Sequence, residues 1–79
     1  MDIRIKLFAA ARELVGQGAL AQDVPDGATV EMLSEKLFEV WPGLRDMRLN
    51  LAVNAVYATP ETVLHDGDEV ALIPPVGGG

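Results

Sequence analysis

The residues with the clearest chemical use stand at the end of the sequence, where Gly77, Gly78 and Gly79 follow residues 74–76, Pro-Pro-Val. Glycine has no Cβ, so a glycine run can enter a narrow channel that a larger residue would block. In such a channel the α-carboxylate of Gly79 could reach the reagents of another protein. The two prolines fix their φ angles and favour an extended segment before the glycines. The pattern predicts a slender arm carrying a carboxylate, and a frayed chain end is the simpler alternative.

The rest of the composition offers little competing chemistry. Cysteine is absent from the 79 residues, so disulfides, thiolate metal ligands and cysteine nucleophiles are excluded. The net charge of −6 disfavours binding to nucleic acid and favours a partner with a basic face. The sequence has no apolar run near the roughly 20 residues that cross a bilayer, and no signal peptide pattern. We therefore expect one small cytoplasmic domain that binds neither membranes nor nucleic acid.

The first part of the chain predicts two strands separated by a short helix. Residues 3–7 alternate between apolar and polar or charged side chains, which is typical of a half-buried strand. Residues 9–15 are rich in good helix formers and are followed by a glycine, as at many helix ends. Residues 19–24 can form a second, weakly patterned strand, and the turn residues at 25–27 allow a return beside the first strand.

The main helix is predicted to begin after Thr29, a suitable N-cap, with Glu31 in the first turn where the helix dipole favours negative charge. Pro42 cannot continue the helical hydrogen bonds, so the helix should end near Val40 or Trp41. Apolar residues recur at spacings of three and four along one face, which should pack on the core: Val30, Leu33, Leu37, Val40 and Trp41.

The second half of the chain predicts strands over 49–54, 55–57 and 69–73, separated by segments rich in turn residues. One helix between strands suits a two-layer α+β domain, a mixed sheet of four to five strands packed on one main helix. If the first and last strands are central neighbours, this is the β-grasp arrangement. We expect residues 1–75 to form this domain and residues 76–79 to form a flexible, functional C-terminal tail.

Three stretches resemble the small subunits of molybdopterin synthase. Residues 7–16 resemble the signature that follows the first strand of that family, and residues 51–54 resemble its central strand and turn. Residues 66–79 are the most specific match, because an acidic turn, an apolar strand, Pro-Pro-Val and the glycines occur together there. The family usually has a variable residue before its terminal glycine pair. Gly77 occupies that position, so the functional pair maps to Gly78 and Gly79.

The resemblance implies a sulfur carrier with a ubiquitin-like β-grasp fold. A partner enzyme would use ATP to adenylate the Gly79 carboxylate, and a sulfur donor would then convert it to a thiocarboxylate. The large subunit of molybdopterin synthase would accept this sulfur on cyclic pyranopterin monophosphate, in molybdenum cofactor biosynthesis. The chain itself would bind no metal and no cofactor. It would be a sulfur-donating subunit without an active site of its own.

The resemblance also implies which residues meet the partners. Gly77 and Gly78 would pass through the channel, while Pro75 and Val76 would contact its entrance. Phe8 is a candidate apolar contact with the large subunit, and core packing is an equally good interpretation of its position. The family assembles as a heterotetramer, with a small subunit at each end of a large-subunit dimer.

Several alternatives remain open from the sequence. A sulfur carrier for thiamine or amino-acid biosynthesis would share the same terminal chemistry, and a ubiquitin-like modifier would instead join Gly79 to lysines on target proteins. A passive interaction module would need no chemistry in the tail. His65 stands beside Asp66 and Asp68 and could suggest a metal site, but turn formation around a glycine explains these aspartates more simply.

Overall fold

A computed structural model describes residues 1–75 of the chain. Within this range the elements follow in an order of strands and helices that agrees with the sequence-based prediction, apart from one added 3₁₀ helix. They are β1 (Asp2–Leu7), α1 (Ala9–Val15), β2 (Ala19–Asp23), α2 (Val30–Val40), the 3₁₀ helix η1 (Pro42–Met47), β3 (Asn50–Val53), β4 (Val56–Tyr57) and β5 (Glu69–Ile73).

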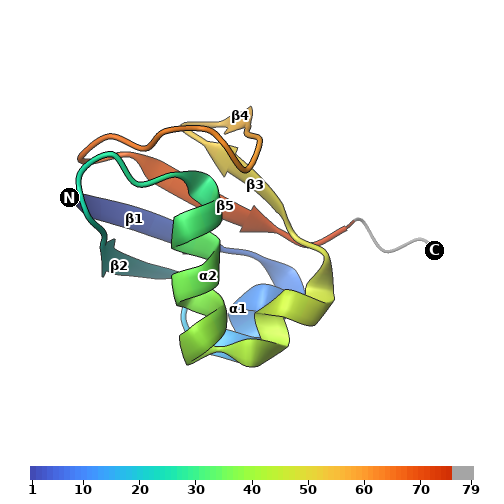
Figure 1. The fold of residues 1–79 in the computed structure, drawn as a ribbon. Helices are drawn as coiled ribbons and strands as arrows, with labels where there is room; N and C mark the ends of the chain where they lie inside the picture. Colours follow the sequence, from blue (N-terminus) through green and yellow to red (C-terminus); the bar gives the residue numbers. More distant parts are fainter. Residues whose placement is uncertain (76–79) are drawn as a thin grey trace.

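The strands form one mixed sheet in the order β2-β1-β5-β3-β4 (Figure 1). The parallel pair β1 and β5 lies at its centre, and the pairs β1–β2, β3–β5 and β3–β4 are antiparallel. First and last strands are thus neighbours, as expected. The α+β, ubiquitin-like β-grasp prediction is confirmed.

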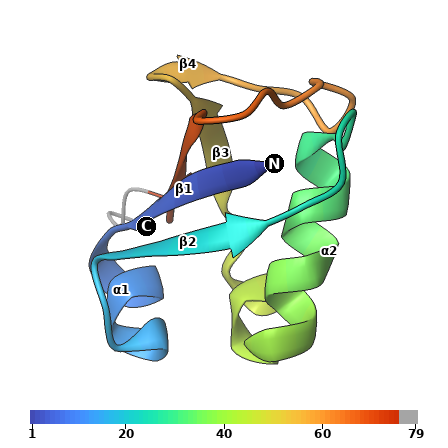
Figure 2. The same ribbon diagram turned by 90° about the vertical axis from the view of Figure 1, so that its left-hand side faces the viewer.

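Helix α2 crosses one face of the sheet (Figures 1 and 2). Its start is fixed by Thr29, whose side-chain oxygen accepts a hydrogen bond of 3.3 Å from the Met32 N–H, as an N-cap should. Val30, Leu33 and Leu37 are buried and Trp41 packs partly buried against the core, as predicted. Val40 was expected on the same face but is 58% exposed, because it is the last residue of α2 and the chain turns away into η1 after it.

The core lies between α2 and the sheet because alternate residues of the central strands point to the same side. In β1 these residues are Ile3, Ile5 and Leu7, which are at most 2% exposed. Val70 and Leu72 of β5 are 0% and 1% exposed and complete the centre of this layer. Each such side chain contributes about 1.5–3 kcal/mol by leaving water, so the two central strands anchor the fold.

The main departure from the prediction follows α2, where no further helix was expected. Pro42 ends α2 as predicted, but the chain continues as η1, and the Leu44 N–H donates to the Trp41 carbonyl at 3.0 Å. Proline is well suited to the first position of a helix because it has no N–H to leave unpaired. Leu44 is only 1% exposed, so burial of this leucine stabilises the extra helical turn.

Candidate functional site

Strand β5 leads from the centre of the sheet directly toward the predicted tail. After Ile73 the chain passes through Pro74, which is partly buried, and Pro75, which is exposed. The remaining predicted site residues are Val76, Gly77, Gly78 and Gly79, and they lie outside the described residues. Their roles therefore stay predictions, as does the division into a domain and a tail.

The last residues of β5 have a second, open face. Because side chains alternate along a strand, Ala71 and Ile73 point away from α2, opposite to the buried Val70 and Leu72. Ala71 is paired with Lys6 of β1 on one side and with Ala52 of β3 on the other. Because Ala71 and Ala52 have small side chains, the open face of the sheet has a depression at this pair.

A hollow of about 390 Å³ lies on this open face, next to the point where β5 ends. It is rimmed by two exposed aromatic rings, Phe8 at 47% and Tyr57 at 72%, and by the ion pair between Lys6 and Glu69 with its N···O distance of 3.5 Å. Exposed aromatic side chains around a concave apolar surface are typical of protein docking sites. The hollow is lined by Lys6, Phe8, Ala52, Ala55, Tyr57, Glu69, Ala71 and Ile73.

The position of Phe8 excludes one of its two sequence-based interpretations, packing in the core. Its backbone is extended, and its carbonyl accepts hydrogen bonds from the N–H groups of Ala11 and Arg12 at 3.1 and 3.3 Å. Ala9 then adopts a positive φ of 48°, which turns the chain from β1 into α1. The ring lies on the open face, so the core-packing alternative is wrong. Contact with a partner remains a prediction.

The far side of the hollow is fixed by the turn between β3 and β4. Asn54 and Ala55 both have positive φ angles, 49° and 70°, as in the two-residue turns that suit hairpins. The Asn54 side chain donates to Asp68 Oδ1 at 2.9 Å and accepts from the Glu69 N–H at 3.0 Å. These bonds tie the β3–β4 hairpin, with Ala55 and Tyr57, to the beginning of β5.

Asp68 completes this attachment through both of its carboxylate oxygens. Its Oδ2 accepts a hydrogen bond of 2.8 Å from the His65 N–H, while Oδ1 accepts from Asn54. Both bonds favour the ionised form, and the Asn54 bond, followed by the His65 bond, holds the pKa of Asp68 below its ordinary value of 3.8. A carboxyl group with a lowered pKa in the folded state stabilises the fold only while it is ionised.

Replacing Asp68 by Asn is expected to lower the free energy of unfolding at neutral pH by about 1–2 kcal/mol. One carboxylate oxygen becomes an NH₂ group, which then faces a donor N–H. Wild-type stability should fall as the pH drops through the unfolded and then the folded pKa of Asp68, so the gap between the two proteins should shrink as the pH is lowered from about 5 into the acid range. Urea denaturation across this range measures it.

The matched control is Asp46→Asn, at an exposed aspartate of η1, which should change stability by less than about 0.5 kcal/mol. Equal stabilities of wild type and Asp68→Asn at neutral pH, or a gap that does not depend on pH, would contradict the role given to Asp68.

The aspartates near His65 have structural roles in the turn that precedes β5. Asp66 Oδ1 accepts a hydrogen bond of 2.7 Å from the Asp2 N–H, and Asp68 is engaged as described. The His65 Nδ1 atom lies 3.9 Å from Asp68 Oδ2, with the imidazole 80% exposed. Within residues 1–75 the structure contains no group of three or more histidine, aspartate or glutamate side chains that could hold a metal ion.

Sequence reasoning missed most of the residues that line the hollow. Ala71 and Ile73 stand in an uninterrupted apolar run, which does not say which face is buried. The alternation of residues 3–7 could have located the open face, once β1 and β5 were placed side by side. Tyr57 was expected only as part of a short strand.

No helix within residues 1–75 has both the length and the apolar character that a bilayer crossing requires.

Comparison with known proteins places this fold and this sequence among well-defined relatives. The model of the ThiS family matches residues 5–79. The molybdopterin synthase sulfur carrier subunit of Escherichia coli (strain K12) is 42% identical over 83 aligned residues, which cover 98% of this chain and 99% of the relative. The protein of the same name from Arabidopsis thaliana is 37% identical, with 100% of this chain and 84% of the relative covered.

A solved structure resembles the whole described fold. SAMP1 of Haloferax volcanii, a small archaeal modifier protein, superposes with a TM-score of 0.89 at 30% identity, and the match covers 100% of both chains. The relatives thus include proteins named as sulfur carriers and a protein named as a modifier.

Proposed function

This chain belongs to the ThiS family, and from that membership we propose that it is the sulfur carrier subunit of a molybdopterin synthase. The observation that carries the proposal is the near full-length similarity to proteins of that name, at 42% and 37% identity. The match to the Escherichia coli protein covers 98% of this chain and 99% of that relative. We propose that the functional group is the carboxylate of Gly79.

The chemistry follows from the properties of a carboxylate. With an ordinary pKa of about 3.3–3.7 a terminal carboxyl group is ionised at neutral pH, so its carbon resists attack until it is activated. In the proposed first step a carboxylate oxygen of Gly79 attacks the α-phosphorus of ATP and pyrophosphate leaves. A sulfur donor at the oxidation level of sulfide then attacks the acyl carbon and forms the C–S bond, AMP leaves with that oxygen, and the S–H proton passes to solvent. The product is a thiocarboxylate.

The sulfur of the thiocarboxylate is a soft nucleophile. We propose that it attacks a side-chain carbon of cyclic pyranopterin monophosphate, bound by the large subunit, and that a C–O bond at this carbon breaks, with its oxygen leaving, as the C–S bond forms. Hydrolysis of the resulting acyl link would return the carboxylate of Gly79 and leave sulfur on the pterin. Both ATP and the sulfur donor are used through the adenylating enzyme, so the carrier needs no bound cofactor. Because activation consumes ATP, we place the pathway in the cytoplasm.

The carrier's own contribution is delivery. Phe8, Tyr57 and the hollow between them lie beside the end of β5, so a protein that covers the open face would also receive the segment after Pro75. We propose that the large subunit docks there, with Phe8, Pro75 and Val76 at the entrance and Gly77 and Gly78 within the channel. Two carriers on a large-subunit dimer would form a heterotetramer.

A modifier function is the second candidate, favoured by the similarity to SAMP1. The same acyl-adenylate could be captured by a lysine amine, which would form an isopeptide bond and release AMP. The two functions differ in the acceptor rather than in the tail, so only an acceptor experiment separates them.

The test is a reconstitution with the adenylating enzyme, ATP, a sulfur donor, the large subunit and cyclic pyranopterin monophosphate. We expect molybdopterin to form, and to form only when the carrier and ATP are both present. Incubation of the carrier with ATP and a cell lysate should give no conjugates of high molecular weight. Conjugates without molybdopterin would overturn the carrier proposal in favour of the modifier.

A further inference from the structure

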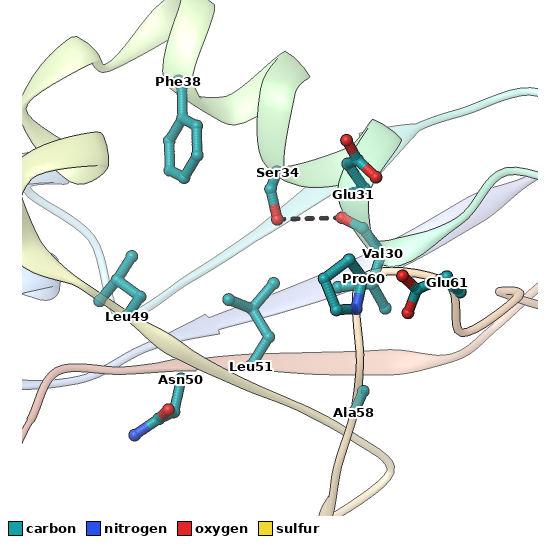
Figure 3. Close-up of a pocket in the computed structure, with 10 residues that line it drawn as sticks. All are labelled: Val30, Glu31, Ser34, Phe38, Leu49, Asn50, Leu51, Ala58, Pro60 and Glu61. Atoms are coloured by element: carbon teal, nitrogen blue, oxygen red, sulfur yellow. Dashed lines mark hydrogen bonds between the residues drawn. The ribbon is translucent and has the colours of Figure 1, made fainter.

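A second groove lies on the helix side of the molecule, away from the open face of the sheet. It runs between α2, the start of β3 and the loop after β4, and has a volume of about 490 Å³. This volume is within the roughly 300–1,000 Å³ range of ligand-binding pockets. Figure 3 shows the side chains that line it: Val30, Glu31, Ser34, Phe38, Leu49, Asn50, Leu51, Ala58, Pro60 and Glu61.

The middle of the groove is apolar. In Figure 3 Phe38 points from α2 toward Leu49 and Leu51, and all three side chains are only partly buried. The guanidinium of Arg45 lies 5.4 Å from the centre of the Phe38 ring, which restrains this ring from the η1 side. The Ser34 hydroxyl donates to the Val30 carbonyl at 2.9 Å, so it adds no unpaired donor. The groove therefore favours a large apolar side chain.

One end of the groove is acidic. Glu31 and Glu61 are both exposed and line this end, where the Glu31 N–H donates to the Pro60 carbonyl at 3.0 Å and brings the two segments together. Neither glutamate forms an ion pair with another residue within 1–75. On a chain with a net charge of −6, this end attracts cations.

We propose that this groove binds a segment of a second protein that inserts a large apolar side chain between Phe38 and Leu51 and places a lysine or arginine against Glu31 and Glu61. The charge complementarity selects a basic segment over a second copy of this acidic chain. The groove lies on the α2 side of the sheet and the open face is the opposite side, so this segment can bind while the open face is covered. The proposal does not depend on sulfur transfer, because it uses no residue of the tail.

The probe is the peptide acetyl-Lys-Leu-Leu-Lys-amide, added to the full chain labelled with ¹⁵N. We expect saturable chemical-shift changes at Val30, Ser34, Leu51 and Ala58, with little change at Ala71 on the open face. The peptide acetyl-Glu-Leu-Leu-Glu-amide has the same leucines with reversed charge and should give no saturable change.

Paired substitutions test the acidic end without altering the apolar floor. Glu31→Gln combined with Glu61→Gln should weaken binding of the lysine peptide about fivefold to tenfold, as expected for the loss of two exposed ion pairs. The control is Glu35→Gln combined with Glu39→Gln, which removes the same charge from exposed positions of α2 outside the groove and should change the affinity less than about twofold.

Four results with the peptides and variants, and one without peptide, would overturn the proposal. The four are no response to the lysine peptide, equal responses to both peptides, shifts centred on the open face, and equal weakening by the two double variants. Concentration-dependent shifts in the groove without peptide would assign it to self-association instead. None of these results bears on thiocarboxylation of Gly79, so this test and that of the proposed function can fail separately.

Discussion

Gly78→Val is expected to lower the rate of sulfur loading or sulfur transfer by about a hundredfold or more, while the protein folds like wild type. Valine adds a branched Cβ to a segment that we propose must pass through a channel in each partner. A displacement of about 1 Å at the reacting atoms can cost about a hundredfold in rate. Every contact described within residues 1–75 stays in place, so the thermal unfolding of the variant should match that of wild type.

Gly77→Ala is the matched control for this substitution. The resemblance assigns Gly77 to a position that varies among small subunits, so a single methyl group there should be tolerated. Thiocarboxylate formation is followed by intact mass, and sulfur transfer by molybdopterin formation. Full activity of Gly78→Val would remove the steric reason for the glycine. Equal losses in both variants would show that the tail has no position-specific requirement.

Phe8→Asp is expected to weaken binding to the large subunit by about a hundredfold or more, the effect of losing a central aromatic contact worth at least about 2–3 kcal/mol. The substitution also places a carboxylate in the apolar interface, where it would lose water without gaining a partner. The ring is already 47% exposed, and the backbone hydrogen bonds that the Phe8 carbonyl accepts do not involve the ring. The fold should therefore be retained. Isothermal titration calorimetry with the purified large subunit measures the change.

Val40→Asp provides a control of the same chemical kind on the other layer of the molecule. Val40 is 58% exposed at the end of α2, and this helix lies on the opposite side of the sheet from the hollow. Its affinity for the large subunit should stay within about threefold of wild type. If Val40→Asp weakened binding as much as Phe8→Asp, the open face would not be the docking surface.

Much of the fold could be predicted because local chemistry and packing agree in the central elements. Thr29 caps α2, Pro42 ends it, and the alternating residues of β1 point the way their pattern predicts. The short 3₁₀ helix η1 was not predictable in this way, because its formation depends on burying Leu44 against elements distant in the sequence.

The candidate site was only partly predictable for a similar reason. The glycines were recognisable as residue types, but their environment lies outside the described residues. Phe8 stood at the junction of a strand and a helix. Its extended backbone continues the alternation of β1, which places its ring on the face opposite the buried Leu7. The neighbours of Phe8 in the hollow come from β3, β4 and β5, so only the strand order brings them together.

The central claim is that Gly79 carries the sulfur, and the intact mass of the full chain tests it most directly. The chain is incubated with ATP, a sulfur donor and an adenylating enzyme that loads another carrier in the same preparation. The mass should rise by the difference between one sulfur and one oxygen atom, and fragmentation should place the change at the C-terminal carboxyl group. An unchanged mass, with the other carrier loaded, would contradict the claim.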